Sequence, residues 1–262
     1  MTESMLKNRA YIVTGGSQGF GFAIAKELIK AGGRVGLVAR STNKLNSAVA
    51  QLEADLGADK ATAATADIRD SSQIQSAFES IQSHFGRVDG LVNNAGVARP
   101  GTIADIPEED LRLQFEINVI GLAMCCQAAI PMLAGSENAR IVNIGSASAS
   151  YREECRHLGI YAASKHAVDR LTAELRDELR AENIGVSLVV PGNSPTDFAK
   201  GWDEERLMKG YKAWSDYGKY METGMEQSDV GEAVVHCVSR RPGVAVDSLT
   251  VRPHLPTEKF TW

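Results

Sequence analysis

Short segments rich in Val, Ile and Leu alternate with longer helical patterns along almost the whole chain of 262 residues. Most of these apolar segments lack a polar residue at every second position, which is typical of strands that are covered on both faces. This alternation predicts a parallel sheet joined by right-handed crossover helices. The segments that we expect to form strands are 10–16, 34–41, 60–68, 89–96, 139–146, 184–192 and 248–253.

Expected crossover helices include 21–31, 71–85 and 161–182. The predicted fold class is therefore α/β, a doubly wound Rossmann-type sheet of seven parallel strands. No linker or internal repeat divides the chain, so we expect a single domain over 1–262. The segment 193–228 departs from the alternation because it gathers Trp, Tyr and Met residues between the last two strands. We expect a small helical lobe that covers a substrate, the alternative being aromatics that only form the lobe's own core.

A glycine-rich turn, TGGSQGFG, joins the first expected strand to the first expected helix. Glycines let the backbone turn tightly and approach a pyrophosphate, whose charge is received by amide N–H groups at the positive end of the helix. The position between a strand and a helix distinguishes a dinucleotide site from a turn without a ligand. The residues that we expect to hold the dinucleotide here are Gly15, Ser17, Gly19, Phe20 and Gly21.

The end of the second expected strand indicates which nicotinamide dinucleotide the site favours. NAD sites of this type commonly place an acid there, about 20 residues beyond the glycine turn, to bind the ribose 2′-hydroxyl. In this chain the first acid after Gly33 is Glu53, and Arg40 and Ser41 stand where the acid is expected. The planar guanidinium of Arg40 can bind a 2′-phosphate and stack on adenine. The pattern favours NADP(H), with a solvated surface arginine as the alternative.

Asp67 ends the third expected strand. Its carboxylate could accept a hydrogen bond from the adenine amino group. It could equally cap the N-terminus of the helix that follows. The sequence leaves both roles open.

Composition and charge argue against several other classes of protein. The net charge is −5 and no run of Lys and Arg is interleaved with aromatics, so we expect neither nucleic acid nor a membrane surface as a partner. The four cysteines show no CxxC or His-spaced pattern, so we expect no disulfide framework and no metal site. We also expect no signal peptide or membrane anchor, and a reducing cytoplasmic location.

Tyr161 and Lys165 lie four residues apart in an amphipathic helical pattern. Residues at i and i+4 face the same side of a helix, so the phenol and the ammonium can point into one volume. A cation beside a phenol favours the phenolate, and this would make Tyr161 a proton donor and acceptor near neutral pH. The ordinary alternative is a half-buried tyrosine ring beside a solvated lysine. The pair therefore indicates catalysis only in combination with the other motifs.

Taken together, the motifs resemble those of the short-chain dehydrogenase/reductase family in order and spacing. They are TGxxxGxG at 14–21, NNAG at 93–96, YAASK at 161–165 and PG at 191–192. The resemblance implies hydride transfer between NADP(H) and a carbonyl or secondary alcohol. It also implies that Tyr161 is the general acid/base and that Lys165 binds the nicotinamide ribose and lowers the tyrosine's pKa.

The family also has a serine that orients the substrate oxygen, and two residues fit this role. Alignment of NIGS with the family's usual NISS selects Ser146, whereas the family's usual spacing from serine to tyrosine selects Ser148. We favour Ser146 because strand ends are held more rigidly than loops. Asn118 matches the family's helical asparagine, which holds a water that relays protons from the lysine to solvent.

Further cofactor contacts are implied by the same resemblance. Asn93 and Gly96 match the segment that supports the sheet and borders the adenine ribose. The residues that match the site for the nicotinamide carboxamide are Pro191, Gly192 and Thr196. Ser194 replaces the family's usual apolar residue, which alters the adjoining substrate wall.

The family is commonly dimeric or tetrameric, so we expect a homodimer or homotetramer. The substrate class stays open among 3-oxoacyl thioesters, ketones, sugar-derived carbonyls and aromatic aldehydes. Two other functions are possible for such a chain. One is an NAD-dependent alcohol dehydrogenase, and the other is a nucleotide-binding sensor without turnover.

Overall fold

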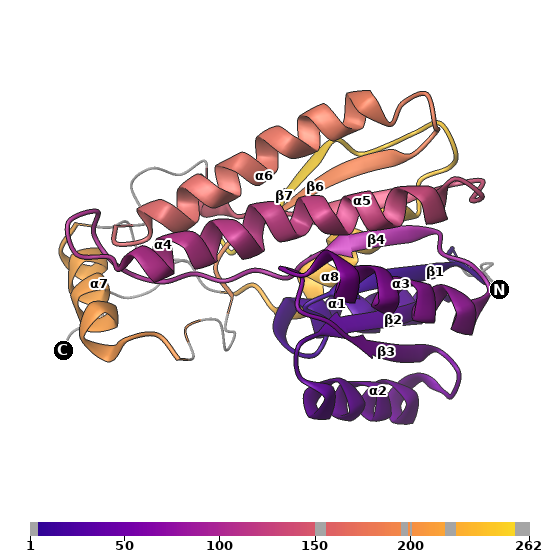
Figure 1. The fold of residues 1–262 in the computed structure, drawn as a ribbon, viewed down its shortest axis with the longest axis horizontal. Coiled ribbons are helices and arrows are strands. Elements are labelled where there is room, and N and C mark those ends of the chain that lie inside the picture. Colours follow the sequence, from indigo (N-terminus) through magenta and orange to yellow (C-terminus); the bar gives the residue numbers. More distant parts are fainter. Residues whose placement is uncertain (1–4, 150–155, 195–198, 200, 218–223, 255–262) are drawn as a thin grey trace.

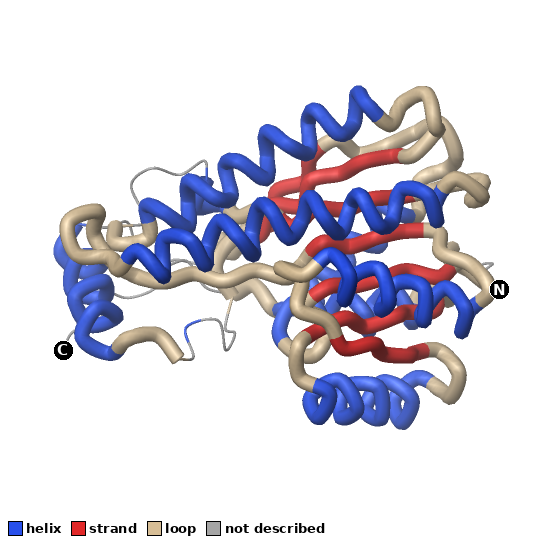
Figure 2. The backbone as a smooth tube through the Cα atoms, in the orientation of Figure 1, coloured by secondary structure: helices blue, strands red, loops and turns tan. Residues whose placement is uncertain are grey.

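A computed structural model describes residues 5–149, 156–194, 199, 201–217 and 224–254. It contains one seven-stranded parallel sheet in the order β3-β2-β1-β4-β5-β6-β7 (Figure 1 and Figure 2). The strands are β1 (Ala10–Thr14), β2 (Arg34–Ala39), β3 (Ala61–Thr65), β4 (Gly90–Asn93), β5 (Arg140–Ile144), β6 (Gly185–Pro191) and β7 (Ser248–Val251). Strand order reverses between β1 and β4, which is the switch point of a doubly wound sheet. The predicted fold class and its seven strands are confirmed.

Helices cover both faces of this sheet (Figure 1). One face carries α1 (Gly19–Lys30), α2 (Thr42–Leu56) and α8 (Gln227–Val238), and the other carries α3 (Ser71–Phe85), α5 (Leu122–Leu133) and α6 (Gly159–Glu178). Ile12 and Leu91 point into the buried cluster that includes α3 and α5. Their chain neighbours Val13 and Val92 point into the cluster that includes α1 and α8. Both faces of each central strand are therefore apolar, which explains why the strands show no polar alternation.

A long helical segment runs from Glu108 to Leu133. It consists of α4 (Glu108–Phe115), a π-helical turn η1 (Glu116–Gly121) and α5. Its length and apolar composition would suffice to cross a membrane, but 44% of its most apolar window is buried inside the protein. Cys125, Ala129 and Leu133 lie in the cluster on the sheet, as expected for the core helix of a folded domain. The π turn is of interest because such turns often occur at functional sites.

The helix α7 (Glu204–Tyr217) lies within the expected lobe, beyond the sheet and near the starts of α4 and α6 (Figure 1). Parts of the expected lobe, at 195–198, 200 and 218–223, are outside the described residues. The bounds 193–228 and the covering role of the lobe stay predictions.

Candidate active site

The glycine turn after β1 is packed so closely that side chains would not fit. Gly15 has φ of 66°, and a Cβ there would lie 2.9 Å from the Asn94 side-chain nitrogen. A Cβ on Gly21 would lie 2.2 Å from the Gly15 carbonyl oxygen, which no packing tolerates. Gly19 also has a positive φ, of 57°. The turn therefore presents bare backbone at the start of α1, next to Ser17 and Phe20, which are half-buried.

Thr14 and Asn94 hold this turn against the end of β4. The Thr14 hydroxyl accepts hydrogen bonds from the backbone N–H groups of Asn94 and Ala95, both at 3.1 Å. The Asn94 side chain in turn donates to the Thr14 carbonyl at 2.9 Å. Sequence reasoning missed this pair, although both residues belong to the quoted motifs and stand at the ends of neighbouring strands.

The start of α1 suits an anion. Within the described part of the chain, Gln18 at the N-cap makes no side-chain capping bond, and the first turn of α1 contains no acid. The amide N–H groups there are consequently available at the positive end of the helix dipole. Together with the glycine backbone, this turn fits a dinucleotide pyrophosphate.

Positive charge lies beside this turn at the end of β2. Arg40 follows β2 directly and is exposed. The Lys44 ammonium donates to the Gln18 side chain at 2.8 Å, so it borders the glycine turn. Ser41 caps α2 by accepting a hydrogen bond from the backbone N–H of Lys44 at 3.4 Å. These residues form an electropositive edge suited to an additional phosphate.

Asp67 does not cap α3, so that alternative from the sequence is wrong. The N-cap is Asp70, whose carboxylate accepts from the backbone N–H groups of Ser72 and Gln73 at 2.9 and 3.1 Å. The chain uses three residues after Asp67 to turn from β3 into the helix, which places the cap on Asp70. Asp67 is instead paired with Arg69, whose hydrogen bonds hold the pKa of its carboxyl below the usual value.

Lys165 is deeply buried on α6, one helical turn beyond the half-buried Tyr161. The residue is 5% exposed, and its ammonium donates to the Ile144 carbonyl at 2.8 Å. Burial lowers the pKa of Lys165 to about 8. Because burial disfavours the charged form of Lys165, its ammonium would interact strongly with a negative charge that forms on a neighbouring proton donor.

Asn118 lies in the π turn and reaches the same region. The residue is 1% exposed, and its side chain accepts from the backbone N–H of Val97 at 2.8 Å and donates to the Val97 carbonyl at 2.8 Å. It also donates to the Ser164 hydroxyl on α6 at 2.9 Å. A Cβ on Gly96 would lie 3.3 Å from the Asn118 side-chain oxygen and 3.4 Å from the Lys165 ammonium. Gly96 therefore lies close to both side chains.

The two candidate serines stand together at the end of β5. Ser146 precedes a short 3-10 turn, η2 (Ala147–Ala149), which carries Ser148. The Ser148 hydroxyl donates to the Ser146 hydroxyl at 2.8 Å, and its backbone N–H donates to the same oxygen at 3.2 Å. Both are half-buried. The turn thus brings both hydroxyls to one place.

The remaining predicted cofactor residues lie in two settings. The Asn93 side chain is buried and donates to Asn143 on β5 at 2.9 Å, so it supports the sheet. Pro191 ends β6, and Gly192 donates its N–H to the Val251 carbonyl at 2.8 Å. Ser194 follows as a buried residue. Thr196 lies outside the described residues.

Comparison with known proteins agrees with this geometry. The short chain dehydrogenase family matches residues 9–207. This chain belongs to the short-chain dehydrogenase family. A relative from Homo sapiens, 3-oxoacyl-[acyl-carrier-protein] reductase, is 32% identical over 223 residues, covering 85% of this chain and 88% of that protein.

Solved structures of other short-chain dehydrogenases show the cofactor class. A short chain dehydrogenase from Burkholderia cenocepacia J2315 in complex with NADP has a TM-score of 0.79 and 31% identity, covering 94% of this chain and 97% of that one. A family member from Burkholderia phymatum in complex with NAD has a TM-score of 0.80 and 25% identity, covering 94% and 89%. The family and these complexes support a nicotinamide dinucleotide as the cofactor of this oxidoreductase.

Proposed function

We propose that this short-chain dehydrogenase transfers hydride between NADP(H) and a carbonyl or secondary alcohol, with Tyr161 as the general acid/base. The observation that carries the proposal is the buried Lys165. Lys165 lies one helical turn from Tyr161, and its ammonium and the Asn118 side chain both lie beside Gly96. A lysine buried to this degree costs stability, so its position is best explained by a task in the site.

Each residue of the site has a distinct role in this proposal. The bound dinucleotide supplies or accepts the hydride. The Tyr161 phenol gives its proton to the carbonyl oxygen in reduction and takes the alcohol proton in oxidation. The Lys165 ammonium stabilises the phenolate that remains, and Asn118 holds the segment at Val97 that borders the lysine. Ser146, with Ser148 as the alternative, orients the substrate oxygen by a hydrogen bond.

Replacement of Arg40 by alanine tests the choice of NADP(H). Loss of a charge-assisted contact to the 2′-phosphate is expected to weaken NADPH binding about 10- to 100-fold and to leave NADH binding nearly unchanged. Calorimetric titration with each nucleotide measures both effects. Arg180→Ala removes another exposed arginine far along the chain and serves as the control.

The titration of the unmodified protein also separates the other functions. Equal binding of NADPH in the wild type and in Arg40→Ala would contradict the proposed role of Arg40. Preference for NADH would favour the NAD-dependent alcohol dehydrogenase. Tight nucleotide binding without turnover of any carbonyl or alcohol would favour the sensor.

We also propose that the protein is a cytoplasmic homo-oligomer, a dimer or a tetramer. Large apolar side chains are exposed on the helices of the site: Ile120 is 52% exposed in η1 and Leu171 is 37% exposed on α6. Such residues are suited to packing between copies of the chain. Cys125 and Cys126 are free thiols, as is usual for proteins of a reducing compartment.

The double variant Ile120→Glu/Leu171→Glu is expected to be monomeric, because two charges would have to be buried in the interface. Sedimentation velocity measures the mass of the particle. Ile103→Glu is the matched control, since Ile103 is 79% exposed but lies outside these helices. An oligomer that survives the double change would place the interface elsewhere.

A further inference from the structure

Three polar side chains form a ladder on one face of the helical segment that begins with α4. Asp110, Gln114 and Asn118 follow one another at intervals of four residues, and counted as whole residues they are 8%, 0% and 1% exposed. Residues at this spacing project to the same side of a helix. The ladder is buried against the extended segment that follows the NNAG motif, so its polar groups need partners there.

Each member of the ladder binds this segment. Asn118 bonds both backbone groups of Val97, as described above. The Gln114 side chain accepts from the backbone N–H of Arg99 at 3.1 Å. The Asp110 carboxylate lies 3.5 Å from the Arg99 side-chain Nε. The three residues of the ladder thus hold this extended segment at Val97 and Arg99.

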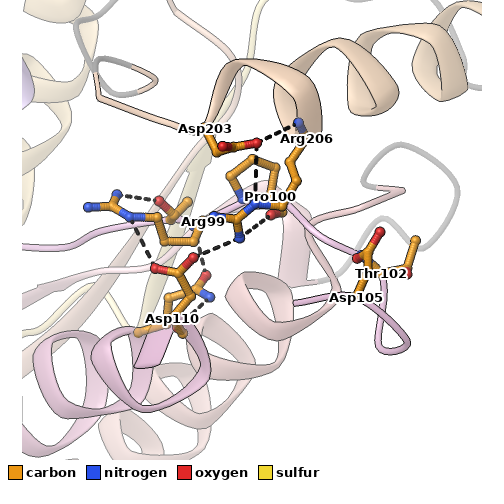
Figure 3. Close-up of polar contacts among 9 residues, drawn as sticks. Arg99, Pro100, Thr102, Asp105, Asp110, Asp203 and Arg206 are labelled. Atoms are coloured by element: carbon orange, nitrogen blue, oxygen red, sulfur yellow. Dashed lines mark hydrogen bonds and ion pairs between the residues drawn. The ribbon is translucent and has the colours of Figure 1, made fainter. Parts of the chain in front are cut away.

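The helix α7 is attached to the far end of this ladder (Figure 3). Nη1 of Arg206 donates to the Asp110 carboxylate at 2.7 Å and to the Pro100 carbonyl at 3.3 Å. The side chains of Arg206 and Asp110 are 20% and 11% exposed, so the pair is largely shielded from water. Asp203 lies 3.5 Å from the Arg206 Nε and orients the guanidinium.

A second attachment joins α7 to the loop before α6. The Trp214 indole donates to the Arg156 carbonyl at 2.6 Å. The backbone carbonyl of the next residue in this loop, His157, accepts from the backbone N–H of Gly101 at 2.8 Å. At this place α7 therefore lies next to two other parts of the chain. They are the extended segment that binds the ladder and the loop that precedes Tyr161.

We propose that Arg206 is a positioning residue for the substrate. Its ion pair with Asp110 holds α7 against the ladder that ends at Asn118. The position of α7 relative to the proton-transfer residues is therefore fixed. This inference rests on the proposed function. Other ion pairs of α7, Glu205 with Lys209 and Lys212 with Asp216, lie within the helix and are more exposed, so they contribute little to its docking.

The test is Arg206→Gln, which removes the charge and leaves Asp110 its second arginine, Arg99. The buried carboxylate keeps a partner, so the domain is expected to fold. With NADPH and the best substrate of a panel holding a ketone, a 3-oxoacyl thioester and an aromatic aldehyde, KM should rise about tenfold, which corresponds to about 1.4 kcal/mol. NADPH affinity should stay unchanged, and amide hydrogen exchange over 204–217 should become faster.

Three further variants make the result specific. Arg206→Lys should restore most of the KM and the slow exchange, because one nitrogen, Nη1, makes both bonds in the present structure. Glu205→Gln breaks an exposed pair on the same helix and should change neither measurement. Asp110→Asn combined with Arg206→Gln should raise KM by less than the product of the two single effects.

Two results would overturn the inference. One is unchanged exchange over 204–217 in Arg206→Gln. The other is exchange that rises equally in the core strands, together with weaker NADPH binding, since this would show a general loss of stability. If the wild type turns over no carbonyl or alcohol, the proposed function fails, and the exchange measurement still decides whether the ion pair holds α7 in place.

Discussion

Phenylalanine at position 161 is expected to lower kcat by a factor of about 10² to 10⁴, because the variant keeps the ring but loses the proton that must reach the substrate oxygen. Tyr161 is half-buried on α6, and removal of its hydroxyl leaves the turn that carries Lys165 in place. The loss should therefore be confined to the chemical step. Steady-state rates with NADPH and a reducible carbonyl measure it, and calorimetry should give the wild-type affinity for NADPH.

A control residue is available on the same helix. Tyr161 belongs to the face that includes Lys165, whereas His166 is exposed to solvent. His166→Phe alters an aromatic polar group one residue beyond the lysine and should leave kcat within about twofold of the wild type, as for most surface substitutions. Full activity in Tyr161→Phe would remove the tyrosine from the mechanism. Weak NADPH binding in that variant would show instead that the site had been distorted.

The sheet could be predicted from the sequence because the information for it is local. In a run such as AYIVT, successive residues point into the two buried clusters on opposite faces of the sheet. The absence of polar alternation in the sequence indicates this burial on both faces. The glycine turn could also be predicted from the sequence, because contacts within the motif and with Asn94 require glycine at Gly15 and Gly21. Elements specified by neighbours along the chain are those that a pattern can reveal.

Features that depend on the order of strands in the sheet or on the exact geometry of a turn could not be predicted. The bond between Thr14 and Asn94 exists because β1 and β4 are adjacent in the sheet, a fact of topology rather than of local pattern. No sequence motif predicts the 3-10 turn that brings the hydroxyls of Ser146 and Ser148 together. The sequence therefore leaves the choice between these two serines open. Asp67 was a reasonable cap by residue type, but the length of the turn assigns that role to Asp70.

Methionine at position 165 is expected to make the nucleotide-free protein more stable at pH 7 and nearly inactive. Lys165 has its pKa lowered from 10.5 to about 8 by burial, so its charged form is disfavoured in the folded state. At pH 7 the lysine is charged in both the folded and the unfolded states, and the shift corresponds to a cost on the order of 3 kcal/mol. Methionine fills a similar volume without a charge and loses only the bond to the Ile144 carbonyl.

The pH dependence separates this cost from an ordinary packing effect. Between about pH 8 and 10.5 the unfolded state holds a proton on Lys165 that the folded state has released, so the contribution of Lys165 to the free energy of unfolding rises with pH. The methionine variant has no such group, and the difference between the two proteins should shrink across this window. Urea unfolding at pH 7 and pH 9.5 measures the difference, in which the titration of all other groups cancels. A difference that stays constant with pH would mean that the ammonium is not strained by burial, and the main argument for a task at Lys165 would fall with it.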